Sequence, residues 1–409
     1  MHVPRRVLSV ENANLPKDVP IVGLGCSSFS TFFWSKDEES SIGGSWTPET
    51  IDRTHPKVQE WIGTIHYAVE ECGITLLDTA PWYGHGTSEV VVGWAMEELL
   101  PRFKRERLTI TTKVGRYEAD PTKQFDFGYD ATLHSVERSL KRMKCDYIDV
   151  LQLHDPEFAP SLHILLNETI PAMMECRKRG WCKALGLTGY PLEVQHQILE
   201  GTQQKVGSSV VVFDQCLTYS HYNLYDTSLL TRPVSDEDPS FGDYCQRNSL
   251  ALMAAAPLSM GLLTHAGPPE WHPANQALQD ACRGAATLCQ THGVNISTLA
   301  IVFALSNPRI SSTLLGMKNI EQVKIAAEAA NRFQQVDVNS KDGSPETILR
   351  EILTEDEYKV WKALANPKEG PFSSVWANDE FRWDGVKEAH SFWAGVPGVE
   401  AEHWQRPLR

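Results

Sequence analysis

The chain has 409 residues and a formal net charge of −14 at pH 7. This acidic balance argues against a binding surface for nucleic acid or anionic membranes, although a phosphate-bearing cofactor needs only a few local donors. The length would suit two average domains, but an α/β barrel uses as many residues in one, and we expect a single domain over residues 1–409.

The nine cysteines are scattered and include no Cys-x-x-Cys pair, which indicates reduced thiols. The apolar run after Arg6 is too short for a signal peptide, and the longest nearly apolar run, 250–263, is too short to span a bilayer. We therefore expect a cytoplasmic protein with no membrane partner and no bound metal. The oligomeric state stays open.

The first expected strand, 19–25, ends in Gly-Leu-Gly-Cys-Ser-Ser, which nearly matches a dinucleotide-binding fingerprint. That fingerprint requires a helix directly after it, and residues 29–34 have no helical period, so we reject this interpretation. Residues 33–56 are polar and glycine-containing, and they form a long insertion in the loop that follows.

Short apolar runs then alternate with amphipathic segments. Helices are expected at 58–72, after an N-cap at Ser88, at 130–143, at 162–179 and at 321–330. Further strands are expected at 74–77, 108–114, 147–155, 184–187, 210–216, 250–255 and 313–315. Repeated β-then-α units predict a parallel sheet, and eight such units close into a (β/α)8 TIM barrel, here over about residues 19–330.

The chain changes character beyond the barrel. Residues 346–364 predict an amphipathic helix, and the extended C-terminal tail of the 345–409 region contains Trp376, Trp383, Trp393 and Trp404. These rings have three possible places, which the sequence does not separate: across the mouth of a pocket, on the outer helices, or in an oligomer contact.

Four polar residues lie at the ends of three successive expected strands. Asp78 ends the strand at 74–77 and Tyr83 follows in its loop, Lys113 lies near the end of the next strand, and His154 ends the third. The C-terminal ends of parallel strands share one face, where ligands bind. Any one of these residues alone is more often structural, with Asp78 and Lys113 as an ion pair, but all four together favour an active site.

These residue types suit proton transfer. A tyrosine titrates near about 10, and a neighbouring ammonium such as that of Lys113 lowers the pKa. Asp78 would hold Lys113, and His154 would hydrogen-bond the substrate oxygen or Tyr83. The arrangement predicts general acid–base chemistry at an alcohol or carbonyl oxygen, with the hydride acceptor supplied by a cofactor.

The motifs Asp78-Thr79-Ala80, Tyr83-Gly84 and Ser88-Glu89 resemble those of the aldo-keto reductases, whose catalytic set is Asp, Tyr, Lys and His in this order. The intervals from Asp78 to Tyr83 and on to Lys113 match the family. The interval to His154 is longer, which fits an insertion around 116–128.

The resemblance implies a nicotinamide cofactor. Thr188 has an alternative role, as a cap for the helix beginning near Pro191, and Ala255 stands where many relatives carry an aromatic residue that stacks on the nicotinamide. The cofactor-binding positions that the resemblance implies are Thr188, Gly189, Gln215, Pro257, Leu258, Ser259, Gly261, Gly316, Met317, Lys318 and Gln322.

Met317 and Gln322 stand where relatives that prefer the phosphorylated cofactor tend to carry Lys and Arg. A 2′-phosphate favours a charge-assisted cationic partner, so we expect NAD. Lys318 and Lys324 lie close enough to keep NADP possible.

Segments 115–117, 154–158, 257–263 and 267–274 resemble family members that oxidise C1 of an aldose to its lactone, on a route to ascorbate-type acids. The expected partner is therefore a small sugar, such as L-galactose or D-arabinose. Three alternatives remain open: an NADPH-dependent aldehyde reductase, a pyridoxal reductase, and a non-enzymatic protein like the potassium-channel β subunits. Candidate substrate-binding residues, each of which has a plausible packing role instead, are Trp82, His85, Arg116 and Trp271.

Overall fold

A computed structural model describes residues 2–8, 10–31, 46–118, 123–207, 211–269, 272, 274–339 and 344–373. Part of the expected insertion at 33–56 and the tryptophan-rich tail lie outside these residues, as does Trp271.

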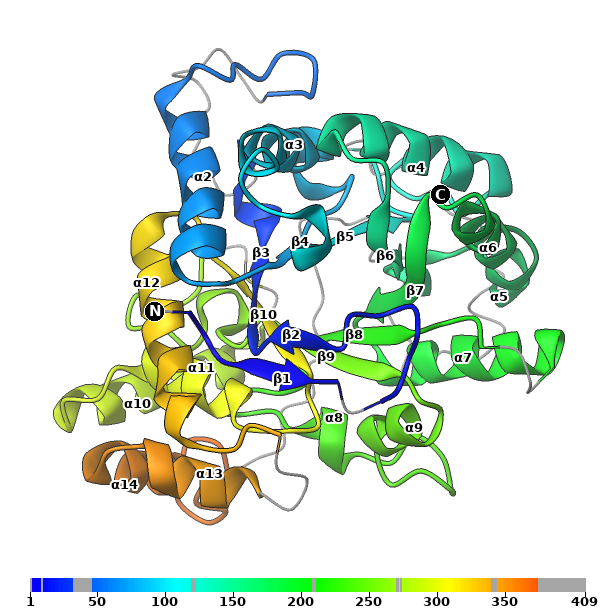
Figure 1. Cartoon of the computed structure of the whole chain (residues 1–409). Helices are drawn as coiled ribbons and strands as arrows, with labels where there is room; N and C mark the ends of the chain where they lie inside the picture. Colours follow the sequence, from blue (N-terminus) through cyan, green and yellow to red (C-terminus); the bar gives the residue numbers. More distant parts are fainter. Residues whose placement is uncertain are drawn as a thin grey trace.

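Eight parallel strands form a closed barrel in which each strand pairs with its neighbours in the chain and β10 closes against β3 (Figure 1). The predicted (β/α)8 fold is confirmed. The strands are β3 (Val22–Gly25), β4 (Leu76–Asp78), β5 (Thr109–Val114), β6 (Ile148–His154), β7 (Cys182–Gly189), β8 (Gln215–Tyr219), β9 (Ala251–Ala255) and β10 (Ser312–Gly316).

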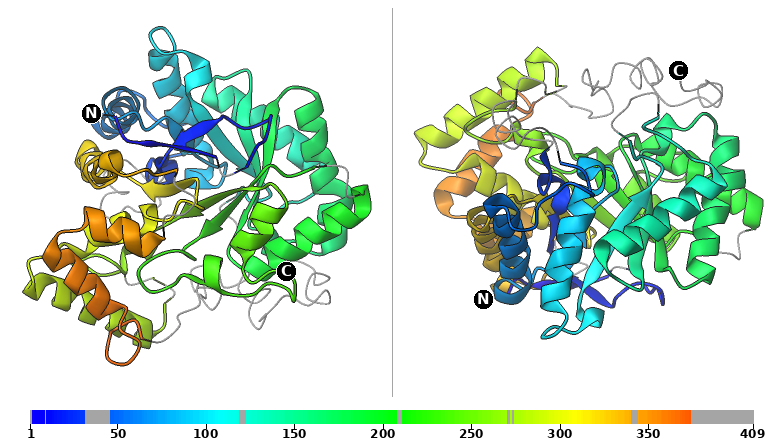
Figure 2. Two further views of the ribbon diagram at one scale, coloured as in Figure 1. Left: turned by 60° about the horizontal axis from the view of Figure 1, so that its bottom comes forward. Right: turned by 90° about the horizontal axis from the view of Figure 1, so that it is seen from above.

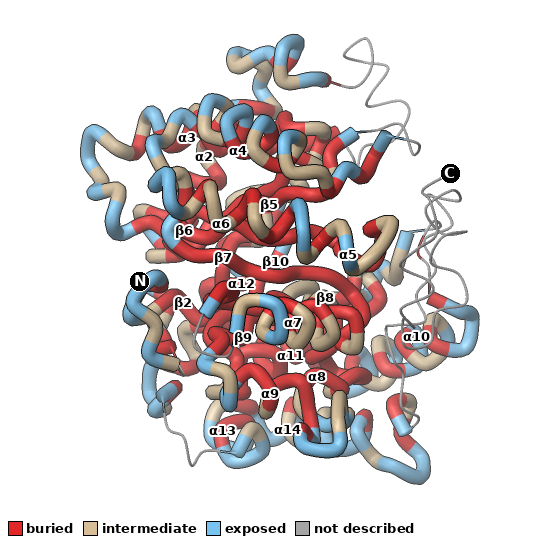
Figure 3. The backbone as a smooth tube through the Cα atoms, turned by 90° about the vertical axis from the view of Figure 1, so that its right-hand side faces the viewer, coloured by how far each residue is buried: buried red, intermediate tan, exposed pale blue. Residues whose placement is uncertain are grey.

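Helices surround the barrel and cover its outer surface (Figure 2). The strands are buried, whereas the outer helices show exposed residues on their solvent side (Figure 3). The helices are α2 (Pro56–His66), α3 (Thr87–Leu99), α4 (Tyr129–Met143), α5 (Leu162–Ile164), α6 (Ile170–Lys178), α7 (Leu192–Val206), α8 (Ser228–Thr231), α9 (Phe241–Arg247), α10 (Gln276–Thr291), α11 (Ile296–Leu305), α12 (Ile320–Asn331), α13 (Pro345–Ile352) and α14 (Glu355–Leu364).

An antiparallel hairpin, β1 (Arg5–Val7) with β2 (Asp18–Pro20), lies across one end of the barrel (Figure 1). Its loop residues Leu8 and Leu15 pack in one apolar cluster with inward-facing residues near the strand starts, such as Leu76 and Ala251. This apolar plug closes the N-terminal end, which leaves the C-terminal strand ends for a functional site.

The inward side chains change from apolar to polar along the barrel axis. Leu76 and Val150 face the apolar plug, and two residues further along the same strands stand Asp78 and Gln152. Because alternate residues of a strand share a face, this two-residue step places polar groups directly above the apolar layer.

Several expected boundaries are wrong. The sixth strand was expected at 210–216 but runs from Gln215 to Tyr219, and Val211 is 56% exposed. Asp214, just before this strand, is fully buried and accepts hydrogen bonds from the Leu185 amide and from two asparagines of the N-terminal segment. A buried carboxylate needs these partners, so Asp214 ties the segment to the barrel instead of extending the strand.

Two helix expectations also need correction. Ser88 is not an N-cap: α3 begins after Gly86, which has a left-handed φ of 100°, and Ser88 lies buried inside the helix. The helix expected at 346–364 is two helices, because Thr354 and Glu357 form a capping box that starts α14.

Within the described residues, no single helix is long and apolar enough to cross a membrane; α10 and α11 pass that test only as a pair bent by 105°. The same part of the chain holds no cluster of three or more His, Cys, Asp or Glu residues that would hold a metal ion. All nine cysteines are free.

Candidate active site

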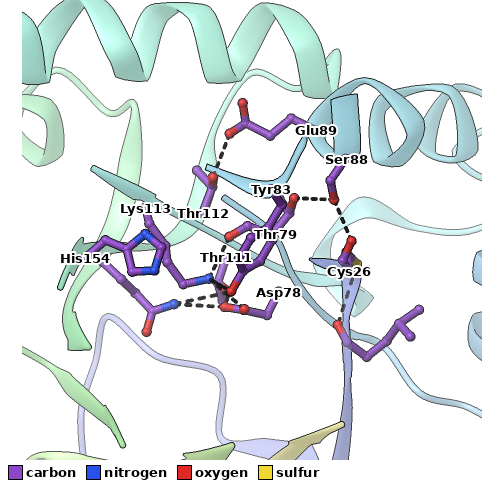
Figure 4. Close-up of polar contacts among 12 residues, drawn as sticks. Cys26, Asp78, Thr79, Tyr83, Ser88, Glu89, Thr111, Thr112, Lys113 and His154 are labelled. Atoms are coloured by element: carbon purple, nitrogen blue, oxygen red, sulfur yellow. Dashed lines mark hydrogen bonds and ion pairs between the residues drawn. The ribbon is translucent and has the colours of Figure 1, made fainter. Parts of the chain in front are cut away.

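The four predicted residues meet at the C-terminal strand ends (Figure 4). Lys113 Nζ donates to Asp78 Oδ2 at 2.7 Å and lies 3.2 Å from the Tyr83 hydroxyl oxygen. The rings of Tyr83 and His154 meet edge to face, with centroids 6.2 Å apart. An acid, an amine, a phenol and an imidazole therefore share one site, as the sequence predicted.

Asp78 and Lys113 are almost completely buried, so each needs several partners. The Asp78 carboxylate also accepts hydrogen bonds from Thr111 Oγ1 at 2.6 Å and from Gln152 Nε2 at 3.0 Å, and Lys113 donates to the Thr79 carbonyl at 2.8 Å. Sequence reasoning missed Thr111 and Gln152. Each lies two residues before a predicted site residue on the same strand, and strand alternation was the signal that would have found them.

A tight turn fixes the position of Tyr83. Gly84, His85 and Gly86 all have positive φ angles, of 58°, 53° and 100°. A Cβ on Gly84 would lie 2.1 Å from Thr87 Oγ1, so this position requires glycine. Behind the turn, the Ser88 hydroxyl donates to the Cys26 carbonyl at 2.8 Å and lies 2.9 Å from Thr79 Oγ1, which ties α3 to the site (Figure 4).

Burial dominates the protonation of the site. It raises the pKa of Tyr83 to about 12, although the Lys113 ammonium acts in the opposite direction. The expectation of a lowered pKa for Tyr83 is therefore wrong in net direction, because desolvation of the phenolate outweighs the ammonium.

Burial also lowers the pKa of His154 to about 3, so its imidazole is neutral near pH 7. For Lys113 burial alone would lower the pKa, but the Asp78 carboxylate and the Tyr83 hydroxyl reverse the direction and raise it. Lys113 therefore stays charged beside the neutral phenol, and a neutral imidazole at His154 can donate or accept a hydrogen bond without adding charge.

The predicted nicotinamide residues lie on β7 and β8. Thr188 is paired in register with His154 and does not cap α7, whose N-cap is Pro191. A Cβ on Gly189 would lie 2.5 Å from Glu157 Oε2, so a larger residue there would require the Glu157 side chain to move. Gln215 is deeper in the barrel than expected, where its amide donates to Gln152 Oε1 at 3.4 Å.

Residues after β9 form a strained loop. Ser259, Met260 and Gly261 are consecutive residues with positive φ angles, each of which costs about 1–3 kcal/mol for a residue other than glycine. The hydroxyl of buried Ser259 lies 2.5 Å from Tyr225 Oη, while Pro257 is buried and Leu258 is half-buried. The Ser259 and Gly261 amides donate to the carbonyls of Ala256 and Leu258, so the loop is a series of tight turns.

The predicted adenosine segment joins β10 to α12. Gly316 is exposed, and the Lys318 amide donates to Gln322 Oε1 at 2.9 Å, so the Gln322 side chain folds onto the helix N-terminus. Met317 is fully buried in the core and presents no side chain to a ligand surface. Lys324 Nζ lies over the ring of Tyr67, 5.9 Å from its centroid.

Three of the four predicted substrate residues lie beside Tyr83. The Arg116 guanidinium lies over the Trp82 ring at 4.0 Å, and the His85 ring is 5.1 Å from Trp82. Trp271 is outside the described residues. Sequence reasoning missed Asp155, which binds Arg116, and Tyr219, whose strand position is paired in register with Ala255.

Comparisons with known proteins agree with this geometry. Residues 42–344 match the model of the aldo/keto reductase family. L-galactose dehydrogenase from Arabidopsis thaliana is 35% identical over 68% of this chain and 81% of that protein, and D-arabinose 1-dehydrogenase from Saccharomyces cerevisiae is 31% identical over 73% and 86%. The fold matches an aldo-keto reductase from Bacillus halodurans at a TM-score of 0.60 and 22% identity, covering 92% and 99% of the two chains. The chain belongs to the aldo/keto reductase family.

Proposed function

We propose that this protein is an NAD-dependent dehydrogenase that oxidises C1 of an L-galactose-like aldose to the lactone. The observation that carries the proposal is the line of contacts from Asp78 through Lys113 to the Tyr83 hydroxyl, which suits proton transfer from an alcohol. The names of the two aldose dehydrogenases above, one with an L-galactose and one with a D-arabinose substrate, support the sugar. Such a lactone would serve a route to ascorbate-type acids.

The residues at the ends of β7, β8 and β9 fit a nicotinamide dinucleotide. Thr188 and Gly189 would hold the carboxamide, Tyr219 would supply a flat face beside Ala255, and the strained 256–261 loop would take the pyrophosphate. The cofactor, when bound, supplies the hydride acceptor that no side chain provides.

The residues of the chain supply the proton chemistry. Tyr83 takes the proton of the C1 hydroxyl, and the adjacent Lys113 stabilises the negative charge of the phenolate that reacts. Asp78 holds Lys113 in place, and the neutral His154 orients the hydroxyl by a hydrogen bond. Partial burial of this group of residues excludes water and strengthens these electrostatic interactions.

We also propose NAD over NADP as the working cofactor, and a cytoplasmic location. The uncharged side chain of Gln322 accepts a hydrogen bond from the Lys318 amide, so it is not a cationic partner for a 2′-phosphate, and exposed Lys324 has its Nζ 5.9 Å from the centroid of the Tyr67 ring. The nine free cysteines suit a reducing compartment.

A screen of NAD reduction over a panel of aldoses, including L-galactose and D-arabinose, tests this proposal. Steady-state oxidation of at least one aldose, with lactone identified as the product and with higher kcat/KM for NAD than for NADP, is the expected result. Rates no higher with any aldose than without sugar would reject it.

A reductase acting on small aldehydes is the second candidate. The NADH-specific methylglyoxal reductase of Escherichia coli is 27% identical over 76% of this chain and 92% of that protein. The same screen run with NADH and methylglyoxal separates the two, because the second candidate requires a larger kcat/KM for the aldehyde than for any aldose.

The pH profile of oxidation is expected to rise towards alkaline pH. Burial raises the pKa of Tyr83 to about 12, so the phenolate fraction grows tenfold per pH unit below that value and log kcat/KM climbs with a slope near +1. Burial lowers the pKa of His154 to about 3, so no inflection near the usual histidine pKa of about 6.5 is expected. Initial rates between pH 6 and 10 measure both features, and a profile that falls with rising pH contradicts the role of Tyr83.

A further inference from the structure

A buried ion pair that the proton-transfer chemistry does not use adjoins the four catalytic residues. Arg116 Nη1 donates to Asp155 Oδ2 at 2.7 Å, and Asp155 Oδ1 lies 3.7 Å from His154 Nε2. The His154 ring also meets the Tyr83 ring edge to face. Asp155 and the reactive phenol of Tyr83 therefore both adjoin the His154 ring.

The Asp155 carboxylate is held between the Arg116 guanidinium and the His154 ring. Asp155 is only 4% exposed, and its amide donates to the Thr188 carbonyl at 2.9 Å, so its backbone is attached to the end of β7. Burial raises the pKa of Tyr190 and of Tyr219, and the Asp155 charge adds to both shifts.

The Arg116–Asp155 ion pair has features that anchoring of its loops alone does not explain. Asp155 has a left-handed φ of 47°, which costs about 1–3 kcal/mol unless its surroundings impose it. Burying an ion pair is often neutral or unfavourable for stability compared with apolar residues. Arg116 Nε is buried and has no hydrogen-bond partner among the described residues, so the surroundings do not satisfy every donor of this guanidinium.

The chemistry of the pair matches a polyhydroxylated ring. A carboxylate accepts hydrogen bonds from hydroxyl groups, and a guanidinium donates to hydroxyl or ring oxygens in a fixed geometry. The face of Trp82, which lies 4.0 Å from the Arg116 guanidinium, adds apolar surface for the C–H groups of a sugar. A small aldehyde such as methylglyoxal offers no ring hydroxyl to accept from or donate to.

We propose that Asp155 and Arg116 form the hydroxyl-recognition site of this enzyme and select polyhydroxylated aldoses over simple carbonyl compounds. Asp155 accepts from one ring hydroxyl away from C1, and Arg116 donates to the oxygen next to it. This inference rests on the proposed aldose oxidation.

The experiment asks whether Asp155 recognises one particular hydroxyl group of the sugar. Asp155→Asn keeps the size of the side chain and suits a left-handed backbone, since asparagine tolerates that conformation. The kcat/KM of wild type and variant are measured with the best aldose of the screen and with each of its monodeoxy derivatives. NAD affinity is measured separately, by quenching of tryptophan fluorescence.

For wild type, we expect one deoxy sugar to lose about 10²-fold or more in kcat/KM, because the buried carboxylate is left without its partner. Asp155→Asn should lose a similar factor with the parent aldose and nothing further with that same deoxy sugar. Its NAD affinity should equal that of wild type.

Asp149→Asn is the matched control. Asp149 is on β6, the strand that Asp155 directly follows, and binds a guanidinium, that of Arg105, at 2.7 Å, but it lies near the N-terminal end of the strand, away from the site. We expect the control to lower the unfolding temperature while its preference among the deoxy sugars stays that of wild type.

Equal losses across the whole deoxy series in wild type and Asp155→Asn would overturn the inference while leaving the aldose oxidation intact. If Asp155→Asn does not fold, Arg116→Gln carries the same test, with a loss confined to the hydroxyl next to the first. An absence of aldose oxidation in wild type is a different result, since it rejects the proposed function itself.

Discussion

The Tyr83→Phe enzyme is expected to turn over about 10²- to 10⁴-fold more slowly than wild type, which is the usual contribution of a positioned proton-transfer group. The substitution removes only the hydroxyl oxygen, 3.2 Å from Lys113 Nζ. The ring keeps its edge-to-face contact with His154 and its position 4.7 Å from the Lys113 ammonium. Stopped-flow or steady-state kcat measures the loss, and NAD affinity is expected to change little.

Tyr222→Phe is the matched control for this experiment. Tyr222 is buried, and its hydroxyl accepts a hydrogen bond from Asn307 at 3.2 Å in a part of the core that the site does not include. Its loss should lower stability by about 1–3 kcal/mol and leave kcat unchanged. A Tyr83→Phe variant with near-normal kcat would refute the role of the phenol, whatever the control does.

The sequence was sufficient to predict the barrel and its four central residues, because both follow from short-range patterns. Asp78, Lys113 and His154 each lie at the end of an apolar or β-branched run, and parallel strands must bring such ends together. The order of strands followed from the alternation of strand and helix. The identities of the four residues are the basis of the proposed chemistry.

The predictions that were wrong depend on contacts between residues that are distant in the sequence. The run Val210-Val211-Val212 has strong strand propensity, yet β8 begins only at Gln215, because Asp214 bonds to the Leu185 amide and to the N-terminal segment. That shift places Gln215 under the site, beside Gln152, and not at its rim. Strand propensity judged over a short stretch of sequence takes no account of hydrogen-bond partners that are distant in the chain.

Electrostatics were also hard to predict from residue types. An ammonium next to a phenol suggested a lowered pKa for Tyr83, but the sign depends on how much water the phenol loses. Likewise, Asp155 was expected only as the last residue of the strand at 147–155, and its bond to Arg116 and its distance to His154 could not be read from residue types.

Asp78→Asn is expected to be the most damaging single substitution at the site. The Asp78 carboxylate accepts hydrogen bonds from Lys113, Thr111 and Gln152, and both Asp78 and Lys113 are almost fully buried. Removing one partner of a buried pair leaves the other charge uncompensated, at a cost of about 3–5 kcal/mol in the free energy of unfolding. Urea denaturation measures that cost, and kcat should fall as well, because Lys113 loses the group that holds it beside Tyr83.

The double variant Asp78→Asn/Lys113→Met separates the cost of an unpaired Lys113 charge from the loss of the contacts that position Lys113. Methionine approximates the length of the lysine stem without its charge, so the double variant has no unpaired ammonium and should be more stable than Asp78→Asn alone. Its activity should remain low, because no cation then faces the Tyr83 hydroxyl. A double-mutant cycle on the free energy of unfolding gives the coupling between the two residues. Strictly additive effects would mean that Lys113 does not depend on Asp78, and the account of how the site holds its cation would be wrong.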